Sequence, residues 1–275
     1  RMKDFQVAVI DSGFGGLTVL SELIGAYPQN NYIYFGDNGH APYGDRSTED
    51  LARLVEDVIG FVQKKPLDAL VLACHTSSTT LGSYFEGKYP FPVMPMVPAS
   101  LEGILAEKAA FSRGGVDVGI MATRGAIRSH VYKKRLLEEV PGLRVSELAC
   151  PNLVPAIEKA DLSAKAMQTL VDEELSSWRG KEPAVVLLGC THYPLVRKEV
   201  QASLGPKTIL VNPARGIAKG LDALLKGKTP VEREKSPLPC RFLYTSGSKK
   251  HFQRFAKRIL PEEEGRALSL FEAVH

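Results

Sequence analysis

Two cysteines occur in the same local pattern in different parts of the chain. Cys74 and Cys190 end runs of apolar, β-preferring residues at 69–74 and 184–190, and a histidine and a threonine follow each within two residues. Such runs are typical of buried parallel strands, and ligands bind at the carboxyl ends of these strands in open α/β sheets. The pattern therefore predicts one site that two thiols approach from opposite sides.

Two thiols on opposite faces of one carbon suit a stereochemical inversion. One thiolate removes a proton from the carbon and the other thiol delivers a proton to the opposite face, whereas a single base would return the proton to its original face. A helix N-terminus or a cationic histidine lowers a cysteine pKa from about 8.5. Asp11 ends the predicted strand 7–11. Its carboxylate could hold a cationic group or take a proton from the Cys74 thiol.

A carbon-bound proton such as the α-proton of an amino acid is very weakly acidic, so the site must stabilise developing negative charge with fixed donors. Backbone N–H groups at the helix starts that follow the strands could supply them. Hydroxyl groups that could bind a substrate carboxylate are those of Ser12, Thr76, Thr123 and Thr191. The glycines at 13–16 lack dinucleotide-binding spacing.

The repetition extends beyond the cysteines. Asp11 precedes Cys74 by 63 residues and Thr123 precedes Cys190 by 67, each from a strand that leads into a glycine-bearing turn. A proline follows the two cysteines at 24 and 23 residues. The period of about 116 residues is the size of a domain. We therefore predict two related α/β halves that face each other.

Strands and helices are predicted to alternate along the whole chain, which indicates βαβ units and mostly parallel sheets flanked by helices. The predicted strands are 7–11, 31–36, 69–74, 93–97, 116–122, 143–149, 184–190, 208–211 and 241–245. The predicted helices are 15–26, 47–64, 77–87, 99–111, 126–138, 152–160, 163–178, 193–203, 214–226 and 248–258.

The composition of the 275 residues, 44% hydrophobic and 24% charged, is ordinary for a soluble globular protein. The net charge of +4 comes from scattered basic groups, which predicts solvated helix faces and no nucleic-acid partner. No signal peptide or membrane-spanning run is expected, and four cysteines without a secretory signal predict reduced thiols in a cytoplasm. Cys150 and Cys240 are expected to be small buried residues.

Several segments together resemble the bacterial glutamate racemases, within the cofactor-independent aspartate/glutamate racemase family. The most specific is Gly-Cys-Thr-His-Tyr-Pro-Leu at 189–195. The others are Asp-Ser-Gly-Phe-Gly-Gly at 11–16, Asp-Asn-Gly-His-Ala-Pro-Tyr-Gly at 37–44, Ala-Cys-His-Thr-Ser-Ser at 73–78, Ala-Thr-Arg-Gly at 122–125 and 149–158. They occur in family order from about residue 7 to about residue 215.

The resemblance implies interconversion of L- and D-glutamate without pyridoxal phosphate or a metal, supplying D-glutamate for peptidoglycan and hence for cell-wall biogenesis and cell shape. It implies that Cys74 deprotonates the D-enantiomer and Cys190 the L-enantiomer. It further implies that Asp11 assists Cys74, while His192 and Glu158 assist Cys190. The pocket residues implied for the substrate are Asp11, Ser12, Pro42, Tyr43, Gly44, His75, Thr76, Thr123, Thr191 and His192.

The resemblance also implies two pseudo-symmetric α/β domains with the active site in the cleft between them, and a homodimer. The first domain is expected to comprise 1–97 plus 211–275, and the second 98–210. The small-molecule amino acid is the expected partner, with no membrane and no nucleic acid.

Two positions depart from the family pattern. His75 replaces the usual Asn after the first cysteine, and Ala126 replaces the usual Thr three residues after Thr123. His75 can still donate one hydrogen bond, and if cationic could pair with a carboxylate. Its greater bulk leaves open a different acid such as aspartate.

Three other interpretations stay open. One is a related racemase of the same superfamily, acting on aspartate or a hydantoin. Another is a metalloprotein that uses Cys74, His75, Cys190 and His192, although the spacing of structural zinc sites is absent. The last is a two-domain module that binds an amino acid without chemistry.

Overall fold

Two parallel β-sheets form the framework of the protein, a computed structural model that describes residues 4–111, 115–159, 161–233, 238–260 and 269–272. The strands are β1 (Gln6–Asp11), β2 (Asn31–Gly36), β3 (Ala69–Leu72), β4 (Val93–Pro95), β5 (Val118–Ala122), β6 (Val145–Ala149), β7 (Val185–Gly189), β8 (Ile209–Val211), β9 (Arg241–Thr245) and β10 (Ser269–Glu272). The first sheet has the order β10-β9-β2-β1-β3-β4, and the second has the order β6-β5-β7-β8. All neighbouring strands are parallel.

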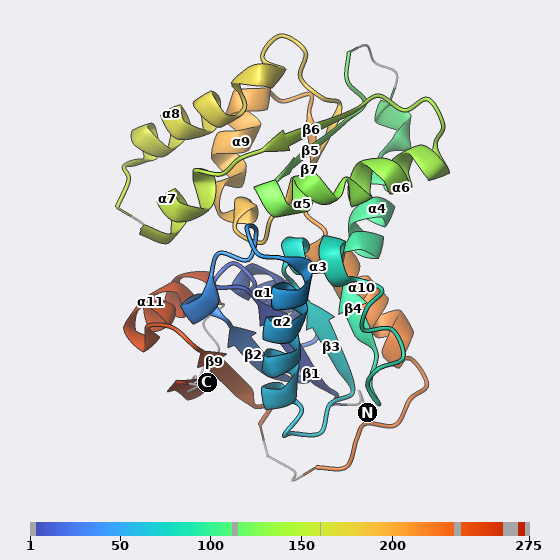
Figure 1. Cartoon of the computed structure of the whole chain (residues 1–275), viewed down its shortest axis with the longest axis vertical. Helices are drawn as coiled ribbons and strands as arrows, with labels where there is room; N and C mark the ends of the chain where they lie inside the picture. Colours follow the sequence, from blue (N-terminus) through green and yellow to red (C-terminus); the bar gives the residue numbers. More distant parts are fainter. Residues whose placement is uncertain (1–3, 112–114, 160, 234–237, 261–268, 273–275) are drawn as a thin grey trace.

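Helices connect the strands and cover the sheets (Figure 1). The α-helices are α1 (Leu17–Ala26), α2 (Thr48–Val62), α3 (His75–Leu81), α4 (Met96–Ala106), α5 (Arg124–Ser129), α6 (Val131–Glu139), α7 (Leu153–Lys159), α8 (Ala164–Glu174), α9 (Arg197–Leu204), α10 (Ala214–Leu225) and α11 (Lys249–Ile259). Four short 3₁₀ helices are η1 (Asn38–His40), η2 (Lys108–Ala110), η3 (Ser176–Trp178) and η4 (Tyr193–Val196).

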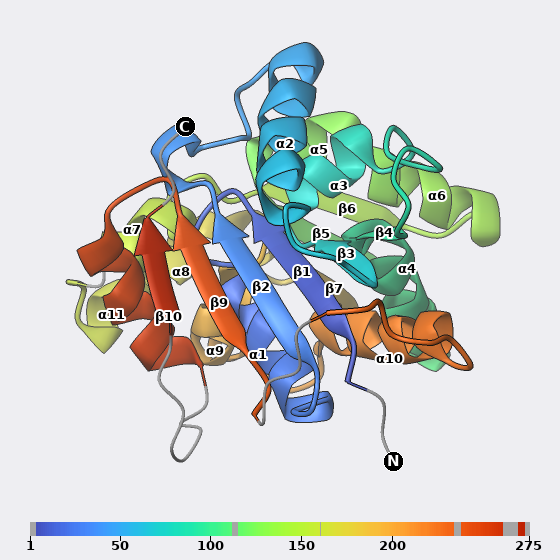
Figure 2. The same cartoon turned by 90° about the horizontal axis from the view of Figure 1, so that it is seen from below.

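The first sheet is buried on both faces because successive side chains of a strand point to opposite sides. In β1, Val7 and Val9 pack with α1, α10 and α11, whereas Ala8 and Ile10 pack with α2. Figure 2 shows α1 and α2 on opposite faces of this sheet. This double covering explains why the strands are apolar runs rather than alternating polar and apolar residues.

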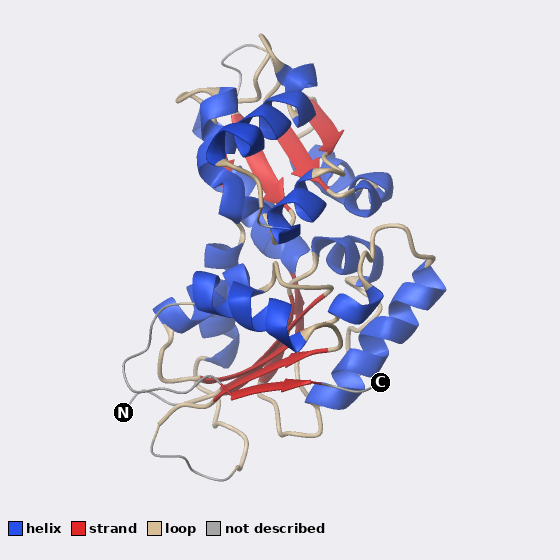
Figure 3. Cartoon of the chain, turned by 90° about the vertical axis from the view of Figure 1, so that its left-hand side faces the viewer, coloured by secondary structure: helices blue, strands red, loops and turns tan. Residues whose placement is uncertain are grey.

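The second sheet repeats this arrangement. Met121, Val186 and Leu188 pack against the side of α7, α8 and α9, while Ile120 and Leu187 pack against the side of α4 and α6. Figure 3 shows the two sheets one above the other along the long axis of the molecule. The predicted fold class, α/β with mostly parallel sheets flanked by helices, is confirmed.

The sequence predictions and the observed elements differ at a few places. Each of the nine predicted strands overlaps an observed strand, but β10 was not predicted. The predicted helix 126–138 is two helices, α5 and α6, because His130 adopts a left-handed conformation with φ of 52° between them. The predicted helix 77–87 is the shorter α3, which begins two residues earlier, at His75, and ends at Leu81.

The strands of the two sheets come from different parts of the chain. The first sheet takes its strands from 6–95 and 241–272, and the second from 118–211. Val211, the last residue of β8, pairs in the second sheet although the predicted boundary follows residue 210. The domain boundaries themselves stay a prediction.

The two halves meet where side chains are small. An ideal Cβ on Gly15 would lie 2.2 Å from Thr191 Oγ1 and 2.4 Å from His192 Nδ1. A Cβ on Gly125 would lie 2.7 Å from the Gly44 carbonyl oxygen. Both distances are too short for a Cβ atom, so the two halves can approach this closely only because residues 15 and 125 are glycines.

We predict that Gly15→Ala destabilises the fold. The added methyl group would displace buried Thr191 and His192, and overpacking of this kind costs about 1–3 kcal/mol. Gly60→Ala is the matched control, because Gly60 lies in α2 with no atom within 4 Å of the new Cβ. This control should gain about 0.5–1 kcal/mol from helix propensity. Denaturant unfolding of both variants is the measurement, and a Gly15→Ala variant as stable as the wild type would contradict the close packing.

Candidate active site

A cavity of about 390 Å³ brings the two repeated cysteine motifs together. The predicted site residues that line it are Ser12, Pro42, Tyr43, Gly44, Cys74, His75, Thr76, Thr123, Glu158, Cys190, Thr191 and His192. The other lining residues are Gly13, Asn38, Ala41, Asp45, Arg124, Cys150, Pro151, Val154 and Pro155. Of the predicted site residues, only Asp11 lies outside this lining.

Cys74 is the residue at which β3 gives way to α3. It is the N-cap of α3, it is buried, and its Sγ donates to Ser12 Oγ at 3.6 Å. Burial raises the pKa of Cys74 to about 11, and the nearby charge of Asp11 adds to this. The expected lowering by a helix N-terminus is therefore outweighed, and the thiol is protonated at neutral pH.

Asp11 ends β1 and lies behind the cavity wall. Its carboxylate accepts hydrogen bonds from the backbone N–H groups of Gly13 at 3.2 Å and Gly16 at 2.9 Å, and from Thr191 Oγ1 at 3.4 Å. Burial raises the pKa of Asp11, while the charge of His192 opposes this shift. Asp11 also lines a smaller cavity together with Cys74.

Cys190 belongs to a chain of three polar side chains. Its Sγ lies 3.7 Å from His192 Nδ1, and His192 Nε2 lies 2.8 Å from Glu158 Oε1. Burial alone would lower the pKa of His192, but hydrogen bonds and negative charge from Cys190 and Glu158 outweigh it and raise that pKa well above its usual range. The imidazole next to Cys190 is therefore a cation at neutral pH.

Threonine hydroxyl groups form hydrogen bonds between the two halves of the molecule. Thr76 Oγ1 and Thr123 Oγ1 lie 2.9 Å apart, and Thr18 Oγ1 donates to the Thr191 carbonyl oxygen at 2.9 Å. Thr123 also caps α5 by accepting from the backbone N–H of Ala126 at 3.3 Å. These contacts fix the hydroxyl groups at the rim of the site.

The segment 41–45 forms another wall of the cavity. Tyr43 is buried, and its hydroxyl donates to Asp37 Oδ2 at 2.5 Å. The Gly44 carbonyl oxygen accepts from Arg128 of α5. This segment is thereby tied to both halves of the molecule.

His75 is neutral, not cationic. Its Nδ1 lies 2.6 Å from the hydroxyl of Tyr132. Burial lowers the pKa of His75 to about 3. Burial therefore favours the uncharged ring, so a hydrogen bond from His75, rather than an ion pair, is the interaction expected with a substrate carboxylate.

Some residues at the site were not predicted. Asn38 and Arg124 line the cavity and lie within the motifs at 37–44 and 122–125, but neither was named as a site residue. Ser77 lines the same small cavity as Asp11 and Cys74, where its hydrogen bonding to Cys74 opposes the rise in the Cys74 pKa. Tyr132 lies 57 residues from its partner His75, and no sequence signal connects them.

The four cysteines are all free. Cys150 is buried as predicted, and it also lines the cavity, where burial raises its pKa. Cys240 was expected to be buried and is only partly so. Over the described ranges, the structure places no group of three or more His, Cys, Asp or Glu side chains where they could hold a metal ion.

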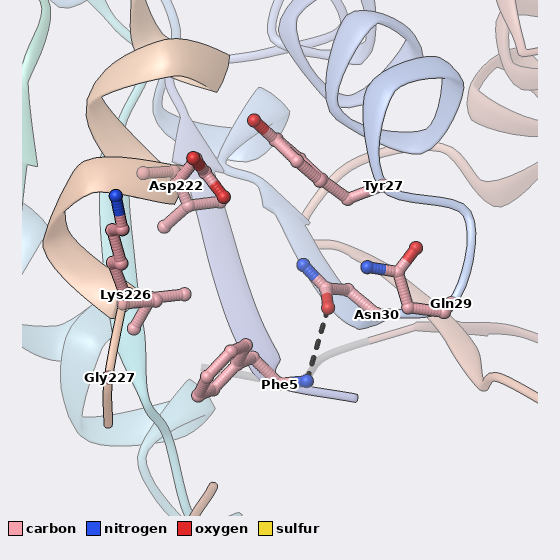
Figure 4. Close-up of a pocket in the computed structure, with 9 residues that line it drawn as sticks. Phe5, Tyr27, Gln29, Asn30, Asp222, Lys226 and Gly227 are labelled. Carbon is pink, nitrogen blue, oxygen red and sulfur yellow. Dashed lines mark hydrogen bonds between the residues drawn. The ribbon is translucent and has the colours of Figure 1, made fainter. Parts of the chain in front are cut away.

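A second cavity, of about 220 Å³, lies at the opposite end of the first sheet. It is bounded by the start of β1, the end of α1 and the end of α10 (Figure 4). Its lining residues are Phe5, Tyr27, Gln29, Asn30, Leu221, Asp222, Leu225, Lys226 and Gly227. This set contains neither a thiol nor a histidine, and neither of the repeated cysteine motifs contributes to it.

None of the helices in the described parts of the chain combines the length and apolar character that crossing a membrane requires.

Comparison with known proteins agrees with this geometry. A family model described as Asp/Glu/Hydantoin racemase matches residues 17–217. The chain is 33% identical over 254 residues to "Glutamate racemase 2" of Caldanaerobacter subterraneus subsp. tengcongensis, covering 92% of each chain.

Two solved structures are similar over nearly the whole chain. Glutamate racemase isoform RacE1 from Bacillus anthracis has a TM-score of 0.85 and 30% identity, covering 99% of this chain and 98% of that one. Glutamate racemase from Francisella tularensis, in complex with D-glutamate, has a TM-score of 0.83 and 25% identity, covering 98% of each. From its sequence match, its fold and its paired thiols, the chain belongs to the Asp/Glu/Hydantoin racemase family and is an isomerase of the racemase class.

Proposed function

We propose that this protein interconverts L- and D-glutamate by a two-base mechanism in which Cys74 and Cys190 are the bases, without pyridoxal phosphate or a metal. The observation that carries this proposal is that both thiols line one cavity of about 390 Å³, where Cys74 donates to Ser12 and Cys190 lies beside the imidazole of His192. The relatives that match over nearly the whole chain carry the name glutamate racemase, which supports glutamate as the substrate.

The unequal surroundings of the thiols suit opposite roles in one turnover. The cationic ring of His192 lies 3.7 Å from Cys190 Sγ, while burial keeps the proton on Cys74. With L-glutamate, the Cys190 thiolate takes the α-proton and the Cys74 thiol delivers its proton to the opposite face. The cycle leaves a Cys190 thiol and a Cys74 thiolate, and exchange of one proton with solvent restores the starting state. Reaction of D-glutamate is the reverse.

The carbanion between the two proton transfers needs hydrogen-bond donors. Ser12, Thr76, Thr123 and Thr191 present hydroxyl groups around the cavity, and α3 begins beside Cys74 with its N-terminal N–H groups. Donors fixed before reaction stabilise developing negative charge more than mobile water does. Asp11 lines a small cavity together with Cys74, and we propose that it takes the proton of Cys74 when D-glutamate is the substrate.

The biological role proposed is supply of D-glutamate for peptidoglycan by a cytoplasmic homodimer. These features come from the family resemblance. Aspartate stays an alternative substrate, because His75 and Ala126 both depart from the glutamate pattern.

We predict deuterium incorporation at the α-carbon with inversion when the protein is given L- or D-glutamate in D₂O under reducing conditions. NMR of each enantiomer of glutamate and aspartate, without added pyridoxal phosphate or metal, is the measurement. Inversion of aspartate alone would show that aspartate is the substrate, and would attribute the change in specificity to His75 and Ala126. No exchange with any of the four would refute the proposed activity and favour a binding role.

We predict that Cys74→Ala and Cys190→Ala each lower kcat/KM for racemisation by at least about 10³-fold, the contribution expected of a general acid or base. Any residual α-proton exchange should be confined to L-glutamate in Cys74→Ala and to D-glutamate in Cys190→Ala. Cys240→Ala is the control, because Cys240 lies outside the cavity, and it should keep full activity. Full racemisation in either active-site variant would rule out the two-base mechanism.

We predict that Glu158→Gln lowers the pKa of His192, because it removes a negative charge 2.8 Å away. A raised pKa stabilises the fold fully below the unfolded value of about 6.5, and this contribution disappears as the pH rises through the folded-state pKa. The loss of unfolding free energy in Glu158→Gln should therefore be larger at pH 6 than at alkaline pH.

Histidine NMR titration and unfolding at several pH values are the two measurements. Glu147→Gln is the matched control, because Glu147 pairs at 2.6 Å with the exposed His130, which lies outside the cavity. If the His192 pKa is the same in Glu158→Gln as in the wild type, the contact with Glu158 does not raise that pKa.

A further inference from the structure

His75 begins α3 directly after Cys74, and its side chain is hydrogen-bonded to a residue from the other half of the molecule. Its Nδ1 lies 2.6 Å from the hydroxyl of Tyr132 in α6, and both side chains are at least 97% buried. His75 lines the cavity, whereas Tyr132 does not. The edge of the ring that faces the cavity is therefore the one opposite Tyr132.

The hydrogen of the Tyr132 hydroxyl decides which ring nitrogen of His75 carries a proton. Ser100 Oγ can donate either to the Met96 carbonyl oxygen at 2.8 Å or to the Tyr132 oxygen at 3.4 Å. If His75 Nδ1–H donated to the Tyr132 oxygen, the Tyr132 hydrogen would have only Ser100 Oγ at 3.4 Å as its acceptor, whereas donation from Tyr132 to Nδ1 uses the short contact of 2.6 Å. The shorter contact favours Tyr132 as the donor and Nδ1 as the acceptor. Burial raises the pKa of Tyr132, so this hydrogen stays on the hydroxyl. A neutral imidazole that accepts at Nδ1 carries its own hydrogen on Nε2.

Nε2 of His75 has no hydrogen-bond partner among the residues that the structure describes, and it is not among their fully buried unpaired atoms. A donor that is unpaired at the wall of a cavity is available to a ligand. The ligand group that matches an uncharged N–H donor is an acceptor oxygen.

We infer that His75 Nε2–H donates a hydrogen bond to a carboxylate oxygen of the substrate, and that Tyr132 is a positioning residue that fixes the required tautomer. This inference rests on the proposed function, since it assigns a role in binding the amino acid. It gives His75 the donor that an Asn amide supplies at this position in the family pattern. Ala126, the other departure, packs in the same buried cluster as Tyr132.

The test is a double-mutant cycle of Tyr132→Phe and His75→Asn, with kcat and KM measured for L- and D-glutamate. Tyr132→Phe keeps the ring and removes the hydroxyl, so His75 loses its fixed tautomer. KM should rise about three- to tenfold, as expected for a weakened hydrogen bond, while kcat changes less than about twofold. An Asn amide needs no partner to set a tautomer, so Tyr132→Phe should have no further effect on KM in the His75→Asn background.

Tyr32→Phe is the matched control, because it removes another buried tyrosine hydroxyl, one that donates to the Leu23 carbonyl oxygen. It should leave KM unchanged. The inference is overturned if Tyr132→Phe leaves KM unchanged, or raises it equally in both backgrounds. Wild-type protein that racemises no glutamate would overturn the proposed function instead.

A second measurement does not depend on the folding of a variant. ¹⁵N NMR of wild-type protein labelled at histidine should show a protonated Nε2 and an unprotonated Nδ1 at His75 near neutral pH. A proton on Nδ1, or on both nitrogens, would overturn the assignment of the donor.

Discussion

Close contact between the turn after β1 and the second half of the chain is the constraint on which the site depends. Gly15 has no side chain, and this lets Thr191 and His192 approach its backbone. The same turn supplies the N–H groups of Gly13 and Gly16 that hold Asp11. One short segment thus fixes the carboxylate of the first half and the imidazole of the second.

Buried ionisable groups of the site differ in charge because their hydrogen-bond partners differ. His75 and His192 follow the two cysteines and are both buried, yet burial lowers the pKa of one while charged partners raise the pKa of the other. His75 bonds to a phenol, whereas His192 lies between Glu158 and Cys190. Identical residue types beside each thiol therefore become a neutral donor and a cation.

The sequence predicted the framework well because its signals are local or repeated. The apolar runs, which are covered by helices on both faces, correctly predicted nine strands. The repeated cysteine motif predicted that Cys74 and Cys190 share one site, and both line the same cavity. A strand that lacks such a run, β10, was missed. The break of the helix at His130 was also missed, because a single left-handed residue leaves the apolar periodicity on both sides intact.

Electrostatic states were harder to predict than positions. A helix start beside Cys74 indicated a lowered pKa, but the sequence does not show how deeply the thiol is buried or that Asp11 is near it. The Tyr132 partner of His75 comes from the other half of the chain, so the charge of His75 could not be read from its neighbours. These properties depend on long-range packing, which motifs do not contain.

Thermodynamics limits how far the different surroundings of the two thiols can affect the rates of the two reaction directions. L- and D-glutamate have the same free energy in water, so kcat/KM must be equal in the two directions of racemisation whatever surrounds each thiol. The contrast between Cys74 with its Ser12 contact and Cys190 with its His192 contact can change only kcat and KM separately. In the proposed mechanism, this contrast determines which protonation state of the free protein binds each enantiomer. In the proposed two-base mechanism, the cation on the Cys190 side and the protonated thiol on the Cys74 side would prepare the resting site for L-glutamate, and the proton exchange that follows turnover would prepare it for the D-enantiomer.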